Sequence, residues 1–351
     1  MVRVVVISAS FGAGHDGAAA ELTRRLTAQG CEVRRYDFVD LLHGHAGRLL
    51  RGLYRRQLTT APRTWGWLLA LAGTDRSTTT AARLTTVADH ATLDAIGTGA
   101  ALVVSTYPLA SQVLGRLRQQ GRLAAPAVTY LTDLSVHPLW VADGVDVHLA
   151  LHDEAAREAK EHGASDVRIV APAVAPAFAE PLPAATLARV RRRYGLPADL
   201  RLALVVAGAW GVGPVVRAAA DIAATGMAVP VIACGHNQPL RRRLQHAGYG
   251  IALGWVDDMA ALMRACDVVV QNAGGLSSLE ALTAAVPALT YRCLPGHGRA
   301  NADALDRTGW IPWVRERADL PGALHRAMST PPPFTPAPTT PETVLTELAG
   351  G

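Results

Sequence analysis

The sequence alternates short apolar runs with glycine-rich turns and helical segments, and it does so twice. The first series begins with Val2–Ser8, which is apolar apart from Arg3, and continues through a glycine turn into a helix from about Asp16 to Gln29. Short apolar runs of this kind are typical of strands buried on both faces of a parallel sheet. The second series restarts at Leu202–Ala207 with the same order of strand, glycine turn and helix. The pattern therefore predicts an α/β fold with doubly wound parallel sheets.

A proline-rich segment separates the two series. The stretch APAVAPAFAEPLPAA, which begins at Ala171, is typical of a linker because its prolines cannot donate the hydrogen bonds of a regular element. We therefore predict two Rossmann-like domains at residues 1–172 and 187–329, a linker at 173–186 and a Pro/Thr-rich tail at 330–351. The domains would face each other across a cleft, with their glycine loops at the carboxyl ends of the strands, where open α/β sheets bind ligands.

Composition narrows the classes of function. The chain is 50% hydrophobic and 18% charged, and its net charge of +5 is too diffuse to indicate a nucleic-acid partner. No apolar run approaches about eighteen residues without charges, so no segment is expected to span a membrane. The N-terminus opens directly into a strand, so no signal peptide is expected. The cysteines lack metal-ligand spacing and fit a reducing cytoplasm: Cys31, Cys234, Cys266 and Cys293.

Residues 254–305 carry the most specific chemical pattern. A buried strand at Val268–Gln271 is followed by the Gly274–Gly275 turn and by a helix that contains Glu280. Glycine lets the backbone approach a ligand closely, and a helix start offers unpaired N–H groups to an anion. A carboxylate a few residues later can accept two hydrogen bonds from a sugar diol. Together these features predict a site for a nucleotide diphosphate, whereas the Asp257–Asp258 pair is better placed to cap the next helix than to bind metal.

Two polar clusters follow strands in the first half of the chain. The loop SASFGAGHDG places Gly12 and Gly14 in a turn and His15 at a helix start, where a phosphate is favourable, although many such turns contain glycine for packing alone. The loop YLTDLSVHPLW contains Asp133 and His137, which could orient one another if the loop turns helically. The alternative is a local hydrogen bond between them that shapes the loop.

Taken in order, these motifs resemble those of GT-B glycosyltransferases. The relevant group includes monogalactosyldiacylglycerol synthase, processive diacylglycerol glucosyltransferase and the lipid II-forming N-acetylglucosaminyltransferase, and is similar to glycosyltransferase family 28. The resemblance covers the chain to about residue 325, through GAGH at 12–15, TDLSVHPLW at 132–140 and the 254–305 segment. It implies an N-terminal acceptor-binding domain, a C-terminal domain that binds a UDP-sugar, and an inverting reaction that requires neither metal nor cofactor.

The resemblance also implies roles for single residues. His15 resembles a catalytic base or positioning donor for the acceptor hydroxyl, which suits an imidazole that titrates near neutrality. The alternative is a helix cap that touches only the diphosphate. Asp133 and His137 are implied as further catalytic residues, and Trp255 with Val256 as a uracil pocket. The implied donor-binding residues are Gly14, Gly208, Gly211, Asn237, Trp255, Val256, Gly274, Gly275, Leu276, Ser277, Glu280 and Asn301.

The segment Arg48–Leu71 mixes five arginines with aromatic and leucine residues. Basic and aromatic residues on an apolar helix suit an anionic membrane surface, and the family uses a similar region for membrane docking and lipid entry. The alternative is an amphipathic helix packed on the first domain. We expect a cytoplasmic protein that can bind the inner face of the plasma membrane, through membrane or acceptor contacts at Arg51, Tyr54, Arg55, Trp65, Trp67 and Trp140.

Several positions depart from the family pattern. Trp210 stands where relatives often have a hydroxyl residue, His236 replaces a base, and Gly298 with Arg299 replaces acidic or amide residues ahead of Asn301. The identity of the sugar is therefore left open.

The combined expectation is a metal-independent hexosyltransferase that moves a sugar from a UDP-sugar to a membrane lipid such as diacylglycerol. The altered positions also allow a soluble small-molecule acceptor. A UDP-N-acetylglucosamine 2-epimerase would share the two-domain architecture, and a degenerate UDP-sugar sensor would explain the missing contacts. Of these, the ordered motifs favour glycosyl transfer.

Overall fold

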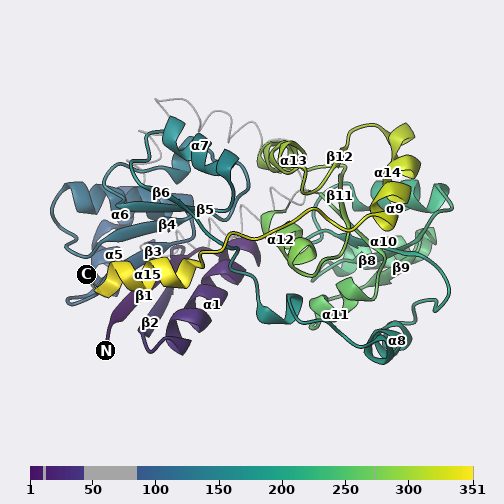
Figure 1. Cartoon of the computed structure of the whole chain (residues 1–351), viewed down its shortest axis with the longest axis horizontal. Coiled ribbons are helices and arrows are strands. Elements are labelled where there is room, and N and C mark those ends of the chain that lie inside the picture. Colours follow the sequence, from purple (N-terminus) through teal and green to yellow (C-terminus); the bar gives the residue numbers. More distant parts are fainter. Residues whose placement is uncertain (11–12, 43–84, 273, 351) are drawn as a thin grey trace. The chain divides into compact units, whose positions relative to one another are not determined.

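The computed structural model describes residues 1–10, 13–42, 85–272 and 274–350. The chain forms two compact units (Figure 1). The first consists of Met1–Ala173 together with Pro336–Gly351, and the second of Val174–Thr335. The chain therefore begins in the first unit, passes once through the second, and returns.

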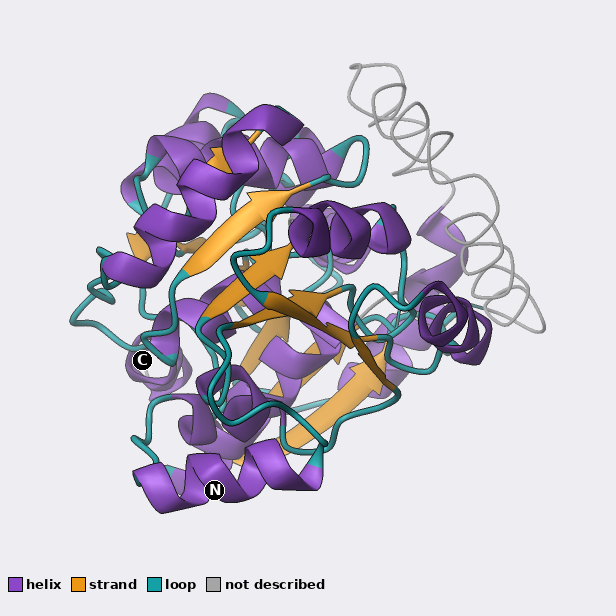
Figure 2. Ribbon diagram, turned by 90° about the vertical axis from the view of Figure 1, so that its right-hand side faces the viewer, coloured by secondary structure: helices purple, strands orange, loops and turns teal. Residues whose placement is uncertain are grey.

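The first unit is built on a parallel sheet with strand order β2-β1-β3-β4-β5-β6. Residues Val4 to Ile7 of β1 are fully buried, because β1 lies between β2 and β3 and helices pack against the sheet (Figure 2). The strands are β1 (Arg3–Ser8), β2 (Glu32–Asp37), β3 (Leu102–Ser105), β4 (Ala127–Tyr130), β5 (Val147–Ala150) and β6 (Val167–Ile169). The helices are α1 (Ala13–Ala28), α5 (Asp89–Ile96), α6 (Pro108–Gln119), α7 (Asp153–Glu161) and α15 (Pro341–Gly350), with 3₁₀ turns η1 (Thr85–Ala88) and η2 (Pro138–Trp140).

The second unit repeats this plan with strand order β12-β11-β10-β7-β8-β9. Its strands are β7 (Leu202–Val206), β8 (Val229–Ala233), β9 (Ile251–Leu253), β10 (Val268–Gln271), β11 (Ala288–Tyr291) and β12 (Trp313–Val314). The helices are α8 (Ala184–Arg193), α9 (Val215–Ala224), α10 (Gln238–Ala247), α11 (Met259–Arg264), α12 (Gly275–Thr283), α13 (His297–Arg307) and α14 (Leu320–Ser329), with 3₁₀ turns η3 (Pro176–Phe178) and η4 (Arg317–Asp319).

Each sheet has one point at which the strand order reverses. In the first unit the chain leaves β1 toward β2 and later returns to β3 on the other side of β1; in the second unit the corresponding neighbours are β7 and β10. Loops that leave such a pair of strands diverge, and ligands bind in the space that opens there. The prediction of two doubly wound parallel sheets is confirmed, and β10 begins and ends at the residues expected from the sequence.

The C-terminal segment differs from the tail anticipated at 330–351. Residues 341–350 form α15, which packs on α1 of the first unit with Val344 and Leu345 buried. Arg25 of α1 anchors it, because Arg25 Nη1 lies 3.3 Å from Glu342 Oε2. The Ala171 N–H also donates to the Thr339 carbonyl over 2.8 Å, so the two chain segments that join the units are hydrogen-bonded to each other.

The proline-rich segment is also more ordered than a linker. It contains η3 and leads into α8, and it belongs to the second unit from Val174 onward. Arg264 of α11 donates to the carbonyls of Phe178 and Ala284 and thereby fixes η3 against the second unit. The prolines are accommodated because η3 places Pro176 at its first position, where an N–H would have no helical partner.

Candidate functional site

His15 lies at the strand reversal of the first unit. It is the third residue of α1, directly after the loop that leaves β1, and its ring reaches the residue that follows β3. His15 Nδ1 is 2.9 Å from the Thr106 carbonyl oxygen and 2.9 Å from Thr132 Oγ1. Because a carbonyl only accepts, the proton of the neutral imidazole belongs on Nδ1. The basic nitrogen of His15 is therefore Nε2.

Thr106 and Thr132 are site residues that the motif analysis missed. Each follows a strand of the first sheet within two residues, and each holds the same imidazole nitrogen. Thr106 Oγ1 also donates to the His15 carbonyl over 3.2 Å, so ring and backbone of His15 are fixed together. Their position after β3 and β4, beside the strand reversal, is the signal that could have identified them.

Trp140 joins Asp133 to the same cluster. The Trp140 indole Nε1 donates to Asp133 Oδ2 over 3.0 Å, and the Trp140 ring centroid lies 5.9 Å from that of His15. Trp140 is only 1% exposed, so the expectation that it contacts a membrane does not fit the structure. Burial of an indole requires a hydrogen-bond acceptor for its N–H, and Asp133 provides it. Trp140 therefore links the Asp133 carboxylate to the His15 ring.

His137 has a different place in this loop. Its Nδ1 accepts a hydrogen bond from the Leu139 N–H at 3.3 Å and caps η2, the only helical turn in the loop. The ring proton is therefore on Nε2, which makes neutral His137 a donor at that nitrogen. Helix α7 and its N-cap residue hold the loop: Glu158 accepts from the Val136 N–H at 2.7 Å, and His152 Nε2 donates to the Leu134 carbonyl at 2.9 Å. The backbone between Asp133 and His137 is thus held by two hydrogen bonds.

In the second unit, the loop after β7 is closed by tight backbone contacts. Asn272, just after β10, donates from Nδ2 to the Val212 carbonyl over 2.7 Å and so bridges the reversal between β7 and β10. Gly213 has a φ of +105°, and a Cβ there would lie 2.8 Å from that same amide nitrogen. Only glycine readily adopts this positive φ and also lacks the Cβ that would collide with Asn272. Gly208 and Gly211 lie in this loop, with φ of +68° and +57°.

The loop after β8 locks onto the loop after β7. The His236 N–H donates to the Ala209 carbonyl over 2.9 Å, and a Cβ on Gly235 would come within 2.3 Å of that oxygen. Asn237 donates to the Trp210 and Gly211 carbonyls and accepts from the Leu240 N–H, so it caps α10. The side chain of Asn237 is therefore used to tie the two loops together.

The predicted base-binding residues stand at the end of β9. Trp255 is 52% exposed, and the His236 ring stacks on it with centroids 4.2 Å apart and planes 5° from parallel. Val256 is buried, which leaves its backbone as the part that a ligand could use. Asp258 caps α11 by accepting from the Ala261 N–H over 3.0 Å, so the expected capping role is confirmed.

The segment after β10 has the arrangement expected of an anion site. Gly274 precedes α12 without a side-chain cap, and Gly275, Leu276 and Ser277 form the first turn with their backbone N–H groups directed away from the helix. Glu280 is half-buried and has no hydrogen-bond or ion-pair partner among the described residues. Burial raises the pKa of the Glu280 carboxyl to about 8. An unpaired acid one turn behind a helix start is poised to accept from a polar ligand.

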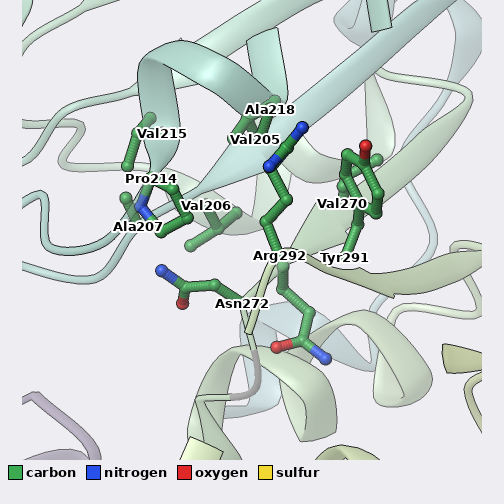
Figure 3. A pocket seen from close by; sticks show the side chains of 11 residues that line it. Val205, Val206, Ala207, Pro214, Val215, Ala218, Val270, Asn272, Tyr291 and Arg292 are labelled. Carbon is green, nitrogen blue, oxygen red and sulfur yellow. The ribbon is translucent and has the colours of Figure 1, made fainter. Parts of the chain in front are cut away.

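The small pocket at the β7/β10 reversal is not the nucleotide site. It has room for only about 10 Å³ and is lined mainly by apolar side chains of β7, α9 and β10, with Asn272 and Arg292 beside them (Figure 3). Ligand pockets typically have about 300–1,000 Å³. The Arg292 side chain extends toward Ala218 there (Figure 3). Its Nε donates to Asp221 Oδ2 over 2.6 Å, and the Tyr291 hydroxyl donates to the same oxygen over 2.9 Å. The Arg292 guanidinium is therefore paired with the Asp221 carboxylate.

Other predicted residues fall in three groups. Gly14 is the second residue of α1. Asn301, in α13, is fully buried, so its side chain faces the protein interior. Arg51, Tyr54, Arg55, Trp65 and Trp67 lie outside the described residues. Across the described ranges, no helix is long and apolar enough to cross a membrane, and no three His, Cys, Asp or Glu side chains are grouped so that they could hold a metal ion.

Residues 15–171 match the family model of monogalactosyldiacylglycerol (MGDG) synthase. Among curated proteins, the processive diacylglycerol β-glucosyltransferase of Bacillus pumilus (strain SAFR-032) is 26% identical over 227 residues, which cover 62% of this chain and 58% of the relative. That of Bacillus subtilis (strain 168) is 26% identical over 216 residues, covering 59% and 55%. The chain thus spans less than two thirds of the length of these relatives.

Solved structures with the same fold cover nearly the whole chain. Acinetobacter baumannii MurG aligns with a TM-score of 0.54 at 16% identity, covering 99% of this chain and 94% of MurG. Anabaena Alr3699/HepE, solved in complex with UDP, aligns with a TM-score of 0.54 at 13% identity, covering 94% and 90%. At these identities the likeness concerns the fold, and it confirms the GT-B architecture. The resemblance to the MGDG synthase and diacylglycerol glucosyltransferase group is likewise confirmed.

Proposed function

We propose that this protein is an inverting glycosyltransferase that moves a hexose from a UDP-sugar to a hydroxyl of a membrane lipid such as diacylglycerol. One observation carries the proposal: the segment that matches the MGDG synthase model begins at His15 and contains Thr106, Thr132, Asp133 and Trp140. The whole hydrogen-bonded cluster at the β1/β3 reversal therefore falls within the part of the chain that resembles lipid glycosyltransferases.

The reaction is a single displacement at the anomeric carbon. The acceptor hydroxyl gives its proton to Nε2 of His15 as its oxygen forms the new glycosidic bond, and the bond from the anomeric carbon to the diphosphate oxygen breaks with its electron pair going to UDP. Thr106 and Thr132 hold the Nδ1 proton away from the acceptor, so the basic nitrogen is the one presented. The Asp133 carboxylate, held by the Trp140 indole that lies near the His15 ring, adds negative charge that favours the imidazolium that forms.

The second unit supplies the donor site. Backbone N–H groups of the 207–213 loop and of the first turn of α12 hold the diphosphate without a metal ion, because unpaired amides and the helix dipole favour its negative charge. Glu280 accepts from the ribose hydroxyls, and Trp255 with the backbone of Val256 contacts the uracil. These interactions stabilise UDP as it leaves.

The acceptor is a lipid that the protein reaches from the membrane surface in the cytoplasm. The basic and aromatic segment Arg48–Leu71 supports this part of the proposal, as do the curated relatives, which are named as diacylglycerol glucosyltransferases.

The test is UDP release from UDP-glucose and UDP-galactose by the full chain, with diacylglycerol in anionic vesicles, in neutral vesicles or absent. We expect turnover that requires diacylglycerol, that is faster on anionic vesicles and that survives a metal chelator. UDP release with soluble alcohols but not with diacylglycerol would overturn the lipid acceptor. Isomerised UDP-sugar without any acceptor would overturn glycosyl transfer.

A further inference from the structure

Helix α10 carries an arginine whose charge is not neutralised by the protein. Arg241 is half-buried, and its guanidinium has no hydrogen bond and no ion pair among the described residues. Its Nε is shielded from solvent and lacks any partner. A buried donor without an acceptor destabilises a fold, and the guanidinium groups of the other half-buried arginines of this unit have protein acceptors. Arg191 and Arg292 pair with Asp267 and Asp221, and Arg264 donates to the Phe178 and Ala284 carbonyls. Among the described half-buried arginines of this unit, Arg241 is therefore the one whose guanidinium lacks a protein acceptor, which a ligand could supply.

The Arg241 side chain lies at the carboxyl ends of β8 and β9. Its Nη1 is 3.4 Å from the point where Gly254, the residue after β9, would carry a Cβ, and Gln238 Nε2 is 3.8 Å from the same point. The backbone of Gly254 does not have the positive φ that requires glycine. Glycine at 254 thus leaves an open surface against which the guanidinium lies, next to Trp255.

The neighbouring surface is an aromatic platform. Trp255 and His236 are both exposed, and their rings are stacked at 4.2 Å. The platform is rigid, because the His236 N–H is held by the Ala209 carbonyl, while Asn237 caps the helix that bears Arg241. A flat exposed ring pair suits a planar ligand ring, and a guanidinium beside it suits a carbonyl oxygen on the edge of that ring.

We infer that Arg241 is a nucleobase-recognition residue, which donates from its guanidinium to a carbonyl oxygen of a pyrimidine ring packed against the Trp255–His236 platform. The inference rests on the proposed function, since it concerns the base of the UDP-sugar donor. A base contact explains why the arginine stands beside the rings and not among the amides of the 207–213 loop and α12, which already suit the phosphates. Uracil, with two ring carbonyls, provides the acceptor.

The test compares binding of uridine, UDP and inorganic pyrophosphate to the native chain and to Arg241→Met. Methionine keeps an apolar stem of similar length and removes every donor. We expect Kd for both uridine and UDP to rise by the same factor, about 10- to 100-fold, as for loss of a hydrogen bond from a charged donor, with pyrophosphate unchanged. Arg241→Lys should recover part of the affinity, because it restores the charge without the planar fork.

Arg242→Met, an exposed neighbour on the same helix, is the matched control and should bind all three ligands like the native chain. A loss for UDP and pyrophosphate with uridine unchanged would assign Arg241 to the phosphates and overturn the inference. Equal binding of UDP by native and Arg241→Met chains would overturn it as well, while leaving the proposed function intact. A native chain that binds neither uridine nor UDP would refute the proposed function itself. Melting temperatures of the variants verify that each is folded.

Discussion

His148 should make the first unit sensitive to mild acid. It lies in β5, is 1% exposed, and neither ring nitrogen has a hydrogen-bond partner among the described residues. Burial lowers the pKa of the His148 imidazole to about 4, against 6.5 for an unperturbed histidine, and Asp166 offsets only part of this. The unfolded chain therefore binds a proton that the folded chain rejects, so stability falls as the pH drops from about 7 toward 4.

The size of the effect follows from the pKa difference. A shift of about 2.5 units is worth up to about 3.4 kcal/mol, of which about 2 kcal/mol is already lost at pH 5 and only about 0.2 kcal/mol at pH 7. Replacing the ring by an apolar one, His148→Phe, removes both this penalty and the unsatisfied polar atoms. We expect the variant to be more stable than the native chain by about 1–3 kcal/mol at pH 7, and by about 2 kcal/mol more at pH 5.

Urea unfolding at pH 7, 6 and 5 measures both quantities. His148→Leu serves as a second variant in case the larger phenylalanine ring overpacks the sheet, and His246→Gln, at an exposed position of α10, is the control. If both apolar variants lose as much stability as the native chain between pH 7 and pH 5, then His148 does not sense the pH and the burial reasoning is wrong.

Three further predictions concern the proposed reaction. His15→Ala should lower the rate of UDP release by roughly two to four decades with UDP binding unchanged; weakened UDP binding at an unchanged rate would instead make His15 a diphosphate contact. Thr132→Val should lower the rate about fivefold, as for one hydrogen bond, and shift the pH–rate profile, whereas Thr132→Ser should restore both; an unaltered profile would remove Thr132 from the mechanism. Because the Glu280 carboxyl, with its pKa of about 8, must lose its proton to accept from both hydroxyls of a ribose diol, affinity for UDP-glucose should rise about tenfold from pH 6 to 7 and about fivefold from pH 7 to 8. Glu280→Gln should bind weakly with no such slope in calorimetric titration, and a slope that persists would place the titrating group elsewhere.

Strands were predictable where polar residues flank a short apolar run. β10 is a short apolar run flanked by the polar residues Asp267 and Asn272, and such a run is typical of a buried parallel strand. β11 and β12 were not anticipated, because the four-residue run of β11 is interrupted by the polar Thr290 and β12 has only two residues. Helix α15 was hidden by the preceding prolines, which suggested a tail although the apolar residues that pack on α1 lie just beyond them.

The candidate site was predictable as a set of loops but not as a set of contacts. The motifs located His15 and Asp133, while the orientation of Trp140 depends on a hydrogen bond to a residue seven positions away in an irregular loop. Sequence alone cannot tell an exposed tryptophan from one buried against a carboxylate. The same holds for Arg241, which is one of three consecutive arginines and is distinguished only by the fold that brings Gly254 beside it.

The return of the chain to the first unit has a consequence for biosynthesis. Residues 174–335 form a contiguous unit, whereas the first unit needs α15, from the last residues described, to cover α1. Domains fold as their residues emerge during translation, so the second unit can complete its core on the ribosome while the α1 surface that receives Val344 and Leu345 is still bare. We therefore expect the unit whose synthesis starts before that of residues 174–335 to mature after it, and nascent chains halted before residue 341 to be the species that chaperones engage.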